Sequence, residues 1–345
     1  MRLLVGIGIG LVFPVAYTLA SEIAPIYNRS NYINNISFAF PLGEMGVCIL
    51  CYFFLTDCEN WRKIVFVIAI PAFISFILLF YIDESPRFLL NTGRYEEAFA
   101  ILDAMGTEKN THLSNSEKSL IKNETEYENI NCTVEVSYKY LVSKEYLYIS
   151  LKIWIIWICS SFIFWGFLFI FPQILAKINL NSPETEKKNI YVELIIASSF
   201  MIPVTIIGGM LSENKYLGRR YSMAVCFAFC GLMCIFCIMF QGSIMIWGGL
   251  LKFGTSCQFC ILITYTSEVY HTKIRTIGSA AANIITRIGG IISPFALELM
   301  LKYYGENGPL FVLFLVSIFS CYLCTTLKVE TYQKPLDQVY KVGSF

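Results

Sequence analysis

Two charged side chains lie deep inside apolar segments of this 345-residue chain. Arg287 lies near the middle of the apolar segment 277–299, and Glu44 lies within the segment 32–55. A charge in the hydrocarbon core of a bilayer costs about 3 kcal/mol or more, so it needs a partner, a cavity or a substrate. The guanidinium group of Arg287 is a planar fork of donors that suits carboxylate, sulfate or phosphate. Arg287 is therefore a candidate for binding an anion, and the alternative is a structural ion pair with an acid of another helix.

Glu44 allows three interpretations. It could couple transport to a proton, because burial disfavours the charged form of a carboxyl group. It could equally pair with Arg287, or form hydrogen bonds in its neutral form within a helix bundle. The residues alone leave these three open.

Trp165 is the aromatic side chain that we expect to face a cavity. It belongs to an apolar segment crowded with aromatic residues, most of which must serve packing. Gly166, beside it, lets another element approach closely. An indole ring in that position could stack on an aromatic anion, although ordinary packing is the simpler interpretation.

The elements that position these residues are expected to be membrane helices. Hydrophobic residues make up 56% of the chain and charged residues only 15%, which is too apolar for an ordinary soluble protein. Nine apolar segments approach or exceed the roughly 20 residues that cross a bilayer: 3–20, 32–55, 63–82, 150–171, 191–211, 221–240, 244–266, 277–299 and 309–327. The formal charge of +1 and the lack of a basic stripe argue against binding of nucleic acid.

The sequence offers little for enzymatic or metal chemistry. Most of the 13 cysteines lie in the apolar segments, where cysteine behaves as a small hydrophobic residue. Cys226, Cys230, Cys234 and Cys237 form one helical stripe, which no histidine or carboxylate joins, so packing is favoured over a metal site. The chain has only 2 histidines. We expect no enzyme activity and no cofactor.

A polar segment divides the apolar ones into groups of three and six. Residues 91–149 are rich in Glu, Lys, Asn, Ser and Thr. Basic residues near the adjoining helix ends favour a cytoplasmic position for this segment. The sequons that begin at Asn123 and Asn131 would then stay unused.

The two groups also share a repeat. Leu4, Gly8, Thr18, Ser21, Glu22, Arg29 and Ser30 recur in register as Leu250, Gly254, Thr264, Ser267, Glu268, Arg275 and Thr276. Such parallel repeats are typical of carriers that bind a substrate between two related halves.

These motifs resemble those of the major facilitator superfamily, in particular its organic cation/anion transporter and synaptic-vesicle-2-related branch. The resemblance rests on Glu84-Ser85-Pro86-Arg87, Gly93-Arg94, Phe164-Trp165-Gly166, Gly218-Arg219-Arg220 and the segment from Arg287 to Phe295. It implies an all-α, two-bundle fold, in which the first segment here matches the family's fourth helix. The family's first three helices would then be missing. In this branch the position of Arg287 tends to be basic in carriers of anions and acidic in carriers of cations.

The resemblance also implies a set of charged residues at the cytoplasmic rim that form ion pairs in one conformation and separate in the other. They are Glu22, Arg87, Arg219, Arg220, Glu268 and Arg275. The alternative is that they only orient the chain and bind lipid head groups. One departure from the family pattern is Lys215, which stands where the family has an aspartate.

The sequence therefore predicts a multi-pass membrane protein that moves a small solute, an organic anion, by alternating access. The expected domains are 1–90 (three helices), 91–149 (cytoplasmic loop), 150–328 (six helices) and 329–345 (cytoplasmic tail). A truncated, non-transporting paralogue that acts as partner or scaffold is the alternative, and a sugar-porter-like carrier is a further one. The expected partners are a small-molecule substrate and the lipid bilayer, and the coupling ion is unknown.

Overall fold

The structure, a computed structural model, describes residues 2–23, 38–54, 61–107, 114, 116–122, 147–181, 190–212, 217–270, 275–327 and 329–330. The regular elements in these ranges are helices. His112, His271, Lys215 and the sequons that begin at Asn123 and Asn131 lie outside them.

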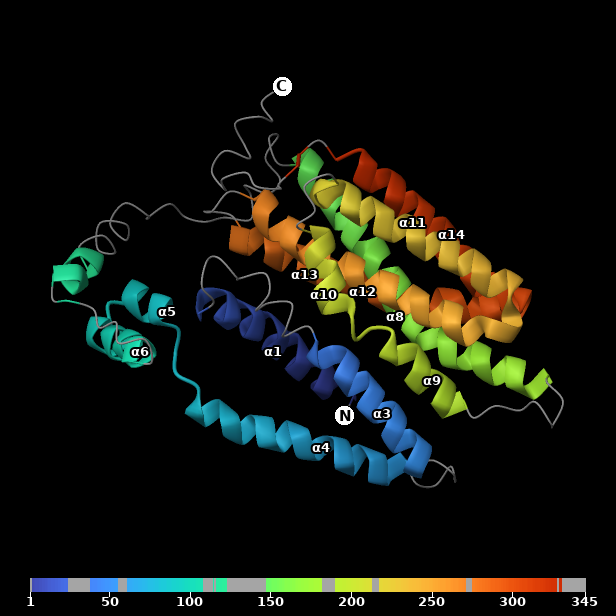
Figure 1. Cartoon of the computed structure of the whole chain (residues 1–345), viewed down its shortest axis with the longest axis horizontal. Helices are drawn as coiled ribbons and strands as arrows, with labels where there is room; N and C mark the ends of the chain where they lie inside the picture. The colour runs from blue at the N-terminus through green and yellow to red at the C-terminus, as the bar shows by residue number, and fades with distance from the viewer. Residues whose placement is uncertain are drawn as a thin grey trace. The chain divides into compact units, whose positions relative to one another are not determined.

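The helices follow the apolar segments closely, because a helix is the element that satisfies every backbone polar group within an apolar segment. Figure 1 labels them by these bounds: α1 Arg2–Ile23, α3 Ala39–Phe54, α4 Trp61–Leu78, α5 Pro86–Asn91, α6 Tyr95–Thr107, α8 Leu147–Asn181, α9 Ile190–Ser199, α10 Val204–Ser212, α11 Gly218–Met239, α12 Ile244–Val269, α13 Arg275–Tyr304 and α14 Asn307–Thr325. Short 3₁₀ turns, Leu79–Tyr81 and Gln241–Ser243, follow α4 and precede α12. The all-helical fold predicted from the sequence is confirmed.

One expected segment, 191–211, forms two helices instead of one. α9 ends at Ser199 and α10 begins at Val204. Pro203 lies between them and has no N–H to donate, so the chain turns there through bonds such as Met201 N to Ser198 O, 3.0 Å. The break leaves Ser198 at the end of α9.

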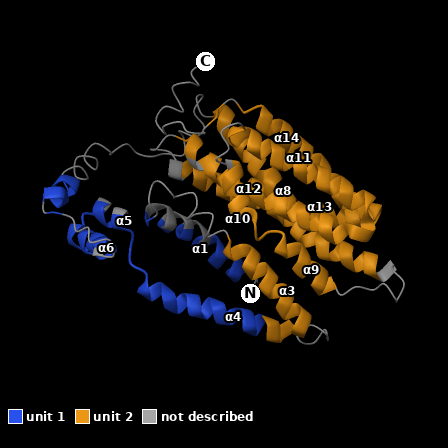
Figure 2. Ribbon diagram, in the orientation of Figure 1, with its two compact units in different colours: residues 1–33, 65–136 blue, residues 34–64, 137–345 orange. Residues whose placement is uncertain are grey.

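The chain divides into two compact units (Figure 2): residues 1–33 with 65–136, and residues 34–64 with 137–345. In the first unit, the Glu84-Ser85-Pro86-Arg87 motif begins a helix. The Ser85 hydroxyl accepts a hydrogen bond from the backbone N–H of Phe88 at 3.3 Å, and Pro86 occupies the first turn of α5. A serine cap followed by proline is a standard helix start, so part of this motif's role is local.

The second unit is a bundle in which α8, α11, α12, α13 and α14 pack side by side (Figure 1). Glycines let α13 approach α8 closely. A Cβ at Gly289 would lie 2.2 Å from the carbonyl oxygen of Ile158, and a Cβ at Gly166 would lie 2.6 Å from Cδ1 of Leu297. Larger residues at these two positions would separate the helices that carry Trp165 and Arg287.

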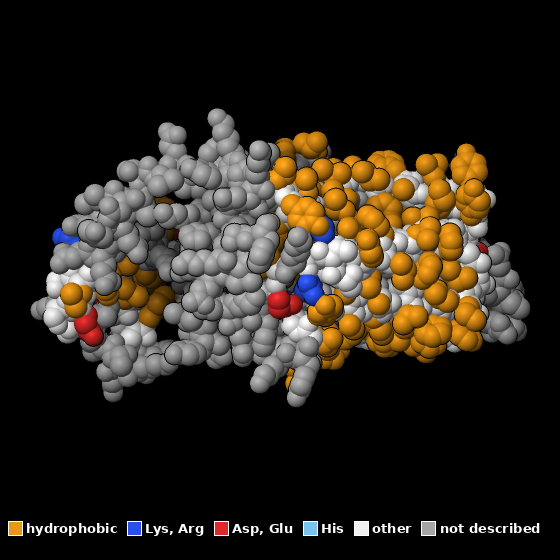
Figure 3. Space-filling view, turned by 90° about the horizontal axis from the view of Figure 1, so that it is seen from above, with side chains coloured by type: hydrophobic (Ala, Val, Ile, Leu, Met, Phe, Trp, Pro, Cys, Tyr) orange, Lys and Arg blue, Asp and Glu red, His pale blue; other side chains and the backbone are white. Residues whose placement is uncertain are grey.

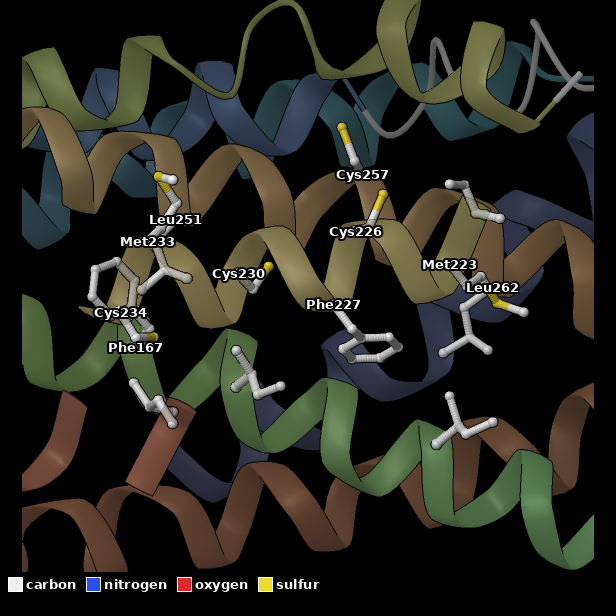
Figure 4. Close-up of a cluster of buried hydrophobic side chains, with 14 of the residues drawn as sticks. Phe167, Met223, Cys226, Phe227, Cys230, Met233, Cys234, Leu251, Cys257 and Leu262 are labelled. Atoms are coloured by element: carbon white, nitrogen blue, oxygen red, sulfur yellow. The ribbon is translucent and has the colours of Figure 1, made fainter. Parts of the chain in front are cut away.

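The cysteine stripe of α11 lies in the core of this bundle (Figure 4). Cys226, Cys230, Cys234 and Cys237 are buried and free. They pack among side chains such as Phe167 of α8 and Leu251 of α12. Their burial among apolar side chains supports the packing interpretation.

Large apolar side chains also cover much of the described outer surface (Figure 3). In the described residues, six helices are long and apolar enough to cross a membrane, α8 and α11–α14 among them. α3 and α9 are shorter apolar helices. An apolar exterior of this kind suits a lipid environment.

Candidate functional site

An ion pair joins α3 to α12 within the second unit. Nζ of Lys252 donates to Oε1 of Glu44. The hydroxyl of Ser198, from α9, donates to the same Glu44 oxygen at 2.9 Å, and Lys252 Nζ lies 3.1 Å from that hydroxyl oxygen. The three polar groups thus form a closed triangle between three helices.

The surroundings of this triangle are apolar. Lys252 is only 4% exposed and Ser198 is fully buried. Nζ of Lys252 also lies 5.8 Å from the centroid of the buried Phe171 ring, a cation–π distance. Glu44 Oε2 is buried and has no hydrogen-bond partner in the described part of the chain. A buried pair of this kind is held by mutual attraction against a large desolvation cost.

Glu44 therefore pairs with Lys252 and not with Arg287. Lys252 is not among the residues predicted from the sequence, although it lies inside the apolar segment 244–266 as Glu44 lies inside its own. The signal that could have found it is the one applied to Glu44: a lone charge in a membrane segment needs a reason.

Trp165 belongs to a cluster of aromatic rings. Its ring centroid lies 5.3 Å from that of Phe164 and 6.2 Å from that of Phe40, which comes from α3. Phe164 continues the cluster to Phe259 of α12 at 5.1 Å. Trp165 is half-buried, and Phe40 lies one helical turn before Glu44. One face of α3 thus contacts the aromatic cluster and the ion pair together.

Arg287 lies on α13, one turn before the contact between α13 and Trp165. A Cβ at Gly290 would lie 3.2 Å from Cδ1 of Trp165. Residues three apart share a helix face, so the Arg287 side chain begins on the face that meets the indole ring. Arg287 is exposed, and the structure gives it no hydrogen bond or ion pair in the described residues.

A second polar cluster lies at the ends of α11 and α12. Arg219 forms an ion pair with Glu268. Glu330, which follows α14, accepts hydrogen bonds from the backbone N–H groups of Arg219 at 2.8 Å and Arg220 at 3.3 Å. Arg220 donates to the carbonyl oxygen of Leu327. We call these residues, Arg219, Arg220, Glu268 and Glu330, the rim network.

Gly218 makes the rim network possible. Its φ is +64°, which favours glycine, and a Cβ there would lie 2.7 Å from the Glu330 carboxylate carbon. Glu330 is not among the residues predicted from the sequence. The remaining rim residues named there, Glu22, Arg87 and Arg275, have side chains outside the described part of the structure.

Three comparisons with known proteins bear on this arrangement. The family model described as "Sugar (and other) transporter" matches residues 1–342. The "Niacin transporter NiaP" of Acinetobacter baylyi is 26% identical over 341 residues, which are 98% of this chain and 74% of that protein. The "Synaptic vesicle 2-related protein" of Bos taurus is 25% identical over 88% of this chain and 56% of its own length. The human "Organic cation/carnitine transporter 2" is 23% identical over 98% of this chain and 58% of its own length.

Among solved structures, the inward open conformation of the xylose transporter XylE from E. coli matches with a TM-score of 0.70. The identity is 17%, and the match covers 98% of this chain and 71% of that chain. A proton:xylose symporter structure of XylE, described as belonging to the major facilitator superfamily, matches with a TM-score of 0.66. At this identity the likeness concerns the fold.

Proposed function

This chain belongs to the sugar (and other) transporter family, within the major facilitator superfamily, and from that premise we propose that it carries a small organic anion by alternating access. Family and helix composition make it a multi-pass membrane protein, and a transporter rather than an enzyme. The substrate class and the residues that bind the substrate are what we propose.

The observation that carries the anion proposal is the close approach of Gly290, one helical turn after Arg287, to the ring of Trp165. Gly290 brings α13 against the indole ring, and Arg287 lies one turn earlier with no acidic partner in the described residues. A guanidinium group beside an aromatic surface can bind the charge and the ring of an aromatic carboxylate together. We assign Arg287 to the carboxylate and Trp165 to the ring.

Two relatives point to different substrates. One is named as a niacin transporter and another as an organic cation/carnitine transporter. Niacin is an aromatic carboxylate and suits an arginine next to an indole. A simple organic cation would meet the charge of Arg287 unfavourably, so we favour the anion.

We further propose that the rim network is one of the ion-pair sets that separate during transport. The ion pair of Arg219 with Glu268 holds the ends of α11 and α12 together, and Glu330 ties the segment after α14 to the start of α11. Glu22, Arg87 and Arg275 would complete the set. In the same proposal, residues 1–90 and 150–328 belong to two helix bundles, and 91–149 with 329–345 face the cytoplasm.

Uptake into proteoliposomes that contain the full chain tests the proposal. Labelled niacin, tetraethylammonium and xylose represent the anion, the cation and the sugar. We expect uptake of niacin alone. Preferential uptake of tetraethylammonium or xylose would replace the anion with the other substrate class, and no uptake of any probe would favour a non-transporting paralogue.

Two variants test the assignment of Arg287. Arg287→Ala removes the charge and should abolish niacin uptake, whereas Arg287→Lys retains the charge and should retain part of the uptake. Lys302→Ala, at an exposed lysine in the last turn of α13, is the matched control. Undiminished niacin uptake by Arg287→Ala would overturn the role of Arg287.

A further inference from the structure

We propose that Lys252 and Ser198 form a binding site for the substrate's carboxylate, that Glu44 occupies this site in the structure described, and that Glu44 leaves it by taking up a proton. This inference rests on the proposed transport of an organic anion. It adds a second position for the substrate's carboxylate, which the substrate occupies at a different stage of transport from the position at Arg287, and it adds an identity for the coupling ion.

The first argument is that the two donors of the proposed site, on Lys252 and Ser198, point at the same place. The ammonium group of Lys252 and the hydroxyl of Ser198 both donate to one carboxylate oxygen, Oε1 of Glu44. Lys252 is 4% exposed and Ser198 fully buried, so these donors meet almost no water. They come from α12 and α9, whereas the carboxylate comes from α3. The carboxylate of Glu44 thus stands where a carboxylate of a ligand would bind once α3 moves away.

The second argument is the ring next to the cation. Phe171 of α8 lies 5.8 Å from Nζ of Lys252 and is fully buried. A carboxylate attached to an aromatic or apolar body would find both an ammonium group and an apolar wall at this place. The site therefore suits the same substrate class as the pair of Arg287 and Trp165.

The third argument is the balance of charge. In the structure described, the carboxylate of Glu44 and the ammonium of Lys252 neutralise each other. If α3 moved away with both groups charged, two unpaired ions would remain in apolar surroundings, at a large cost. A proton from water can neutralise Glu44, and the carboxylate of the substrate can neutralise Lys252. One proton and one anion then enter together, and no net charge moves.

The attachment of α3 to the bundle makes this exchange a control of conformation. Glu44 lies one turn after Phe40, which contacts Trp165, and one turn before Cys48, which lies near the ion pair. Release of Glu44 would loosen the whole face of α3 that contacts α8, α9 and α12. Anion binding and movement of α3 would therefore be linked through one carboxylate.

Few other ionisable groups face Glu44 in the described residues. α12 contributes Lys252, and α3 contributes Cys48 with Cys51 one turn further along the helix. α9 contributes Ser198 and carries the buried carboxylate Glu193 nearer its beginning. Glu193 is thus the matched control for effects of a second buried carboxylate.

A binding experiment on the purified full chain tests the site directly. Niacin supplies the carboxylate, and nicotinamide, which has an uncharged amide in its place, is the matched control ligand. We expect niacin to bind and nicotinamide not to. Affinity for niacin should rise as the pH falls within the range where niacin stays ionised, because a proton must reach Glu44.

Variants of Glu44 and Lys252 test which side chains bind the carboxylate and the proton. Glu44→Gln removes the competing carboxylate, so it should bind niacin about tenfold more tightly and without the pH dependence. Since Lys252→Gln alone leaves Glu44 buried without an ionic partner, the double variant Glu44→Gln/Lys252→Gln is decisive, and it should lose niacin binding. Glu193→Gln should behave as the unmodified chain. Niacin binding that survives in the double variant would overturn the site.

A transport experiment tests the coupling. Proteoliposomes that contain a trapped pH indicator should acidify as niacin enters, at a rate that a potassium–valinomycin voltage clamp leaves unchanged. Niacin uptake without acidification would overturn the proton role of Glu44.

The outcomes for the two proposals are separable. Niacin binding that depends on Lys252, without any uptake, would support the site and overturn the transport function. Uptake that depends on Arg287 but not on Lys252 would support the function and overturn the site. Absence of niacin binding to the unmodified chain would overturn the site.

Discussion

Two clusters of charged residues, the Glu44–Lys252 ion pair and the rim network, differ in how their charges are stabilised. The ion pair lies within apolar helices, and in the described residues each of its charges has one ionic partner. The rim network lies at helix ends. Its charged groups bind backbone N–H groups, a carbonyl oxygen and one another. Glu330 also lies at the N-terminus of α11, where the helix dipole favours a negative charge.

Because of this difference, we expect the stability of the interior pair to depend more strongly on each single side chain than the stability of the rim network does. Removing Arg219 or Arg220 as a side chain leaves Glu330 with the backbone N–H groups that bind it. Removing one member of the interior pair leaves an ion whose remaining polar partner in the triangle is the hydroxyl of Ser198, in apolar surroundings. Variants of the two clusters test this contrast.

The largest effect is expected for Lys252→Met. This variant leaves Glu44 buried without its partner and should lower the free energy of unfolding by about 3–5 kcal/mol. The double variant Glu44→Gln/Lys252→Met removes both charges and should recover most of that loss. Thermal unfolding in detergent is the measurement, with Lys302→Met as the control. Equal loss in the single and double variants would contradict the role of the charge.

Gly218→Ala should have the next largest effect. The new Cβ would have to adopt a φ of +64° and lie 2.7 Å from the Glu330 carboxylate carbon, at a cost of about 1–3 kcal/mol. Gly305→Ala is the matched control, because Gly305 has a similar φ of +68° and nothing lies within 4 Å of a Cβ there. Similar unfolding temperatures for the two variants would show that Glu330 does not hold the start of α11 this tightly.

Glu330→Ala should cost less, about 1 kcal/mol, the usual contribution of a helix cap. Glu306→Ala is the matched control, since Glu306 stands at the N-cap of α14 but makes no side-chain cap hydrogen bond. Amide hydrogen exchange in the first turn of α11 and of α14 would measure both. Exchange should become faster in α11 only, and an unchanged rate there would contradict the capping role.

The smallest expected effect is a difference between the two clusters in how their coupling energies depend on salt. A double-mutant cycle on Arg219 and Glu268, whose side chains are 11% and 22% exposed, should give a coupling energy that falls slightly as the ionic strength rises. The same cycle on Glu44 and Lys252 should change little, because buried pairs are screened much less. Equal salt dependence of the two coupling energies would contradict the difference in environment.

Much of the helical framework could be predicted from the sequence. The expected segments 221–240, 244–266 and 309–327 correspond to α11, α12 and α14 within a few residues. Their length follows from the thickness of a bilayer, and their ends follow from the polar residues between them. The expected segment 150–171 is shorter than α8, which continues through Pro172 to Asn181. The α9–α10 break was not predicted, because the apolar residues of 191–211 run on past Pro203 without interruption.

Fewer features of the candidate site could be predicted from the sequence. Arg287, Glu44 and Trp165 were singled out because each is unusual within its own segment. Lys252 belongs to the same class and was missed, and nothing in the local sequence connects it with Ser198 and Glu44. Glu330 follows the last helix, and its backbone partners lie more than a hundred residues earlier in the chain.

The amino-acid sequence is enough to predict that the chain forms apolar helices, where most of them lie, and which charges in them need an explanation. These are local properties, set by composition and by the cost of exposing backbone polar groups to lipid. Which charges meet depends on the packing of the helices, because a lone ion in an apolar helix is stabilised by any opposite charge that packing brings within reach. Packing placed Lys252 of α12 and Ser198 of α9 against Glu44, while the close contact of α13 with α8 brought Arg287 near Trp165 without an acidic partner in the described residues.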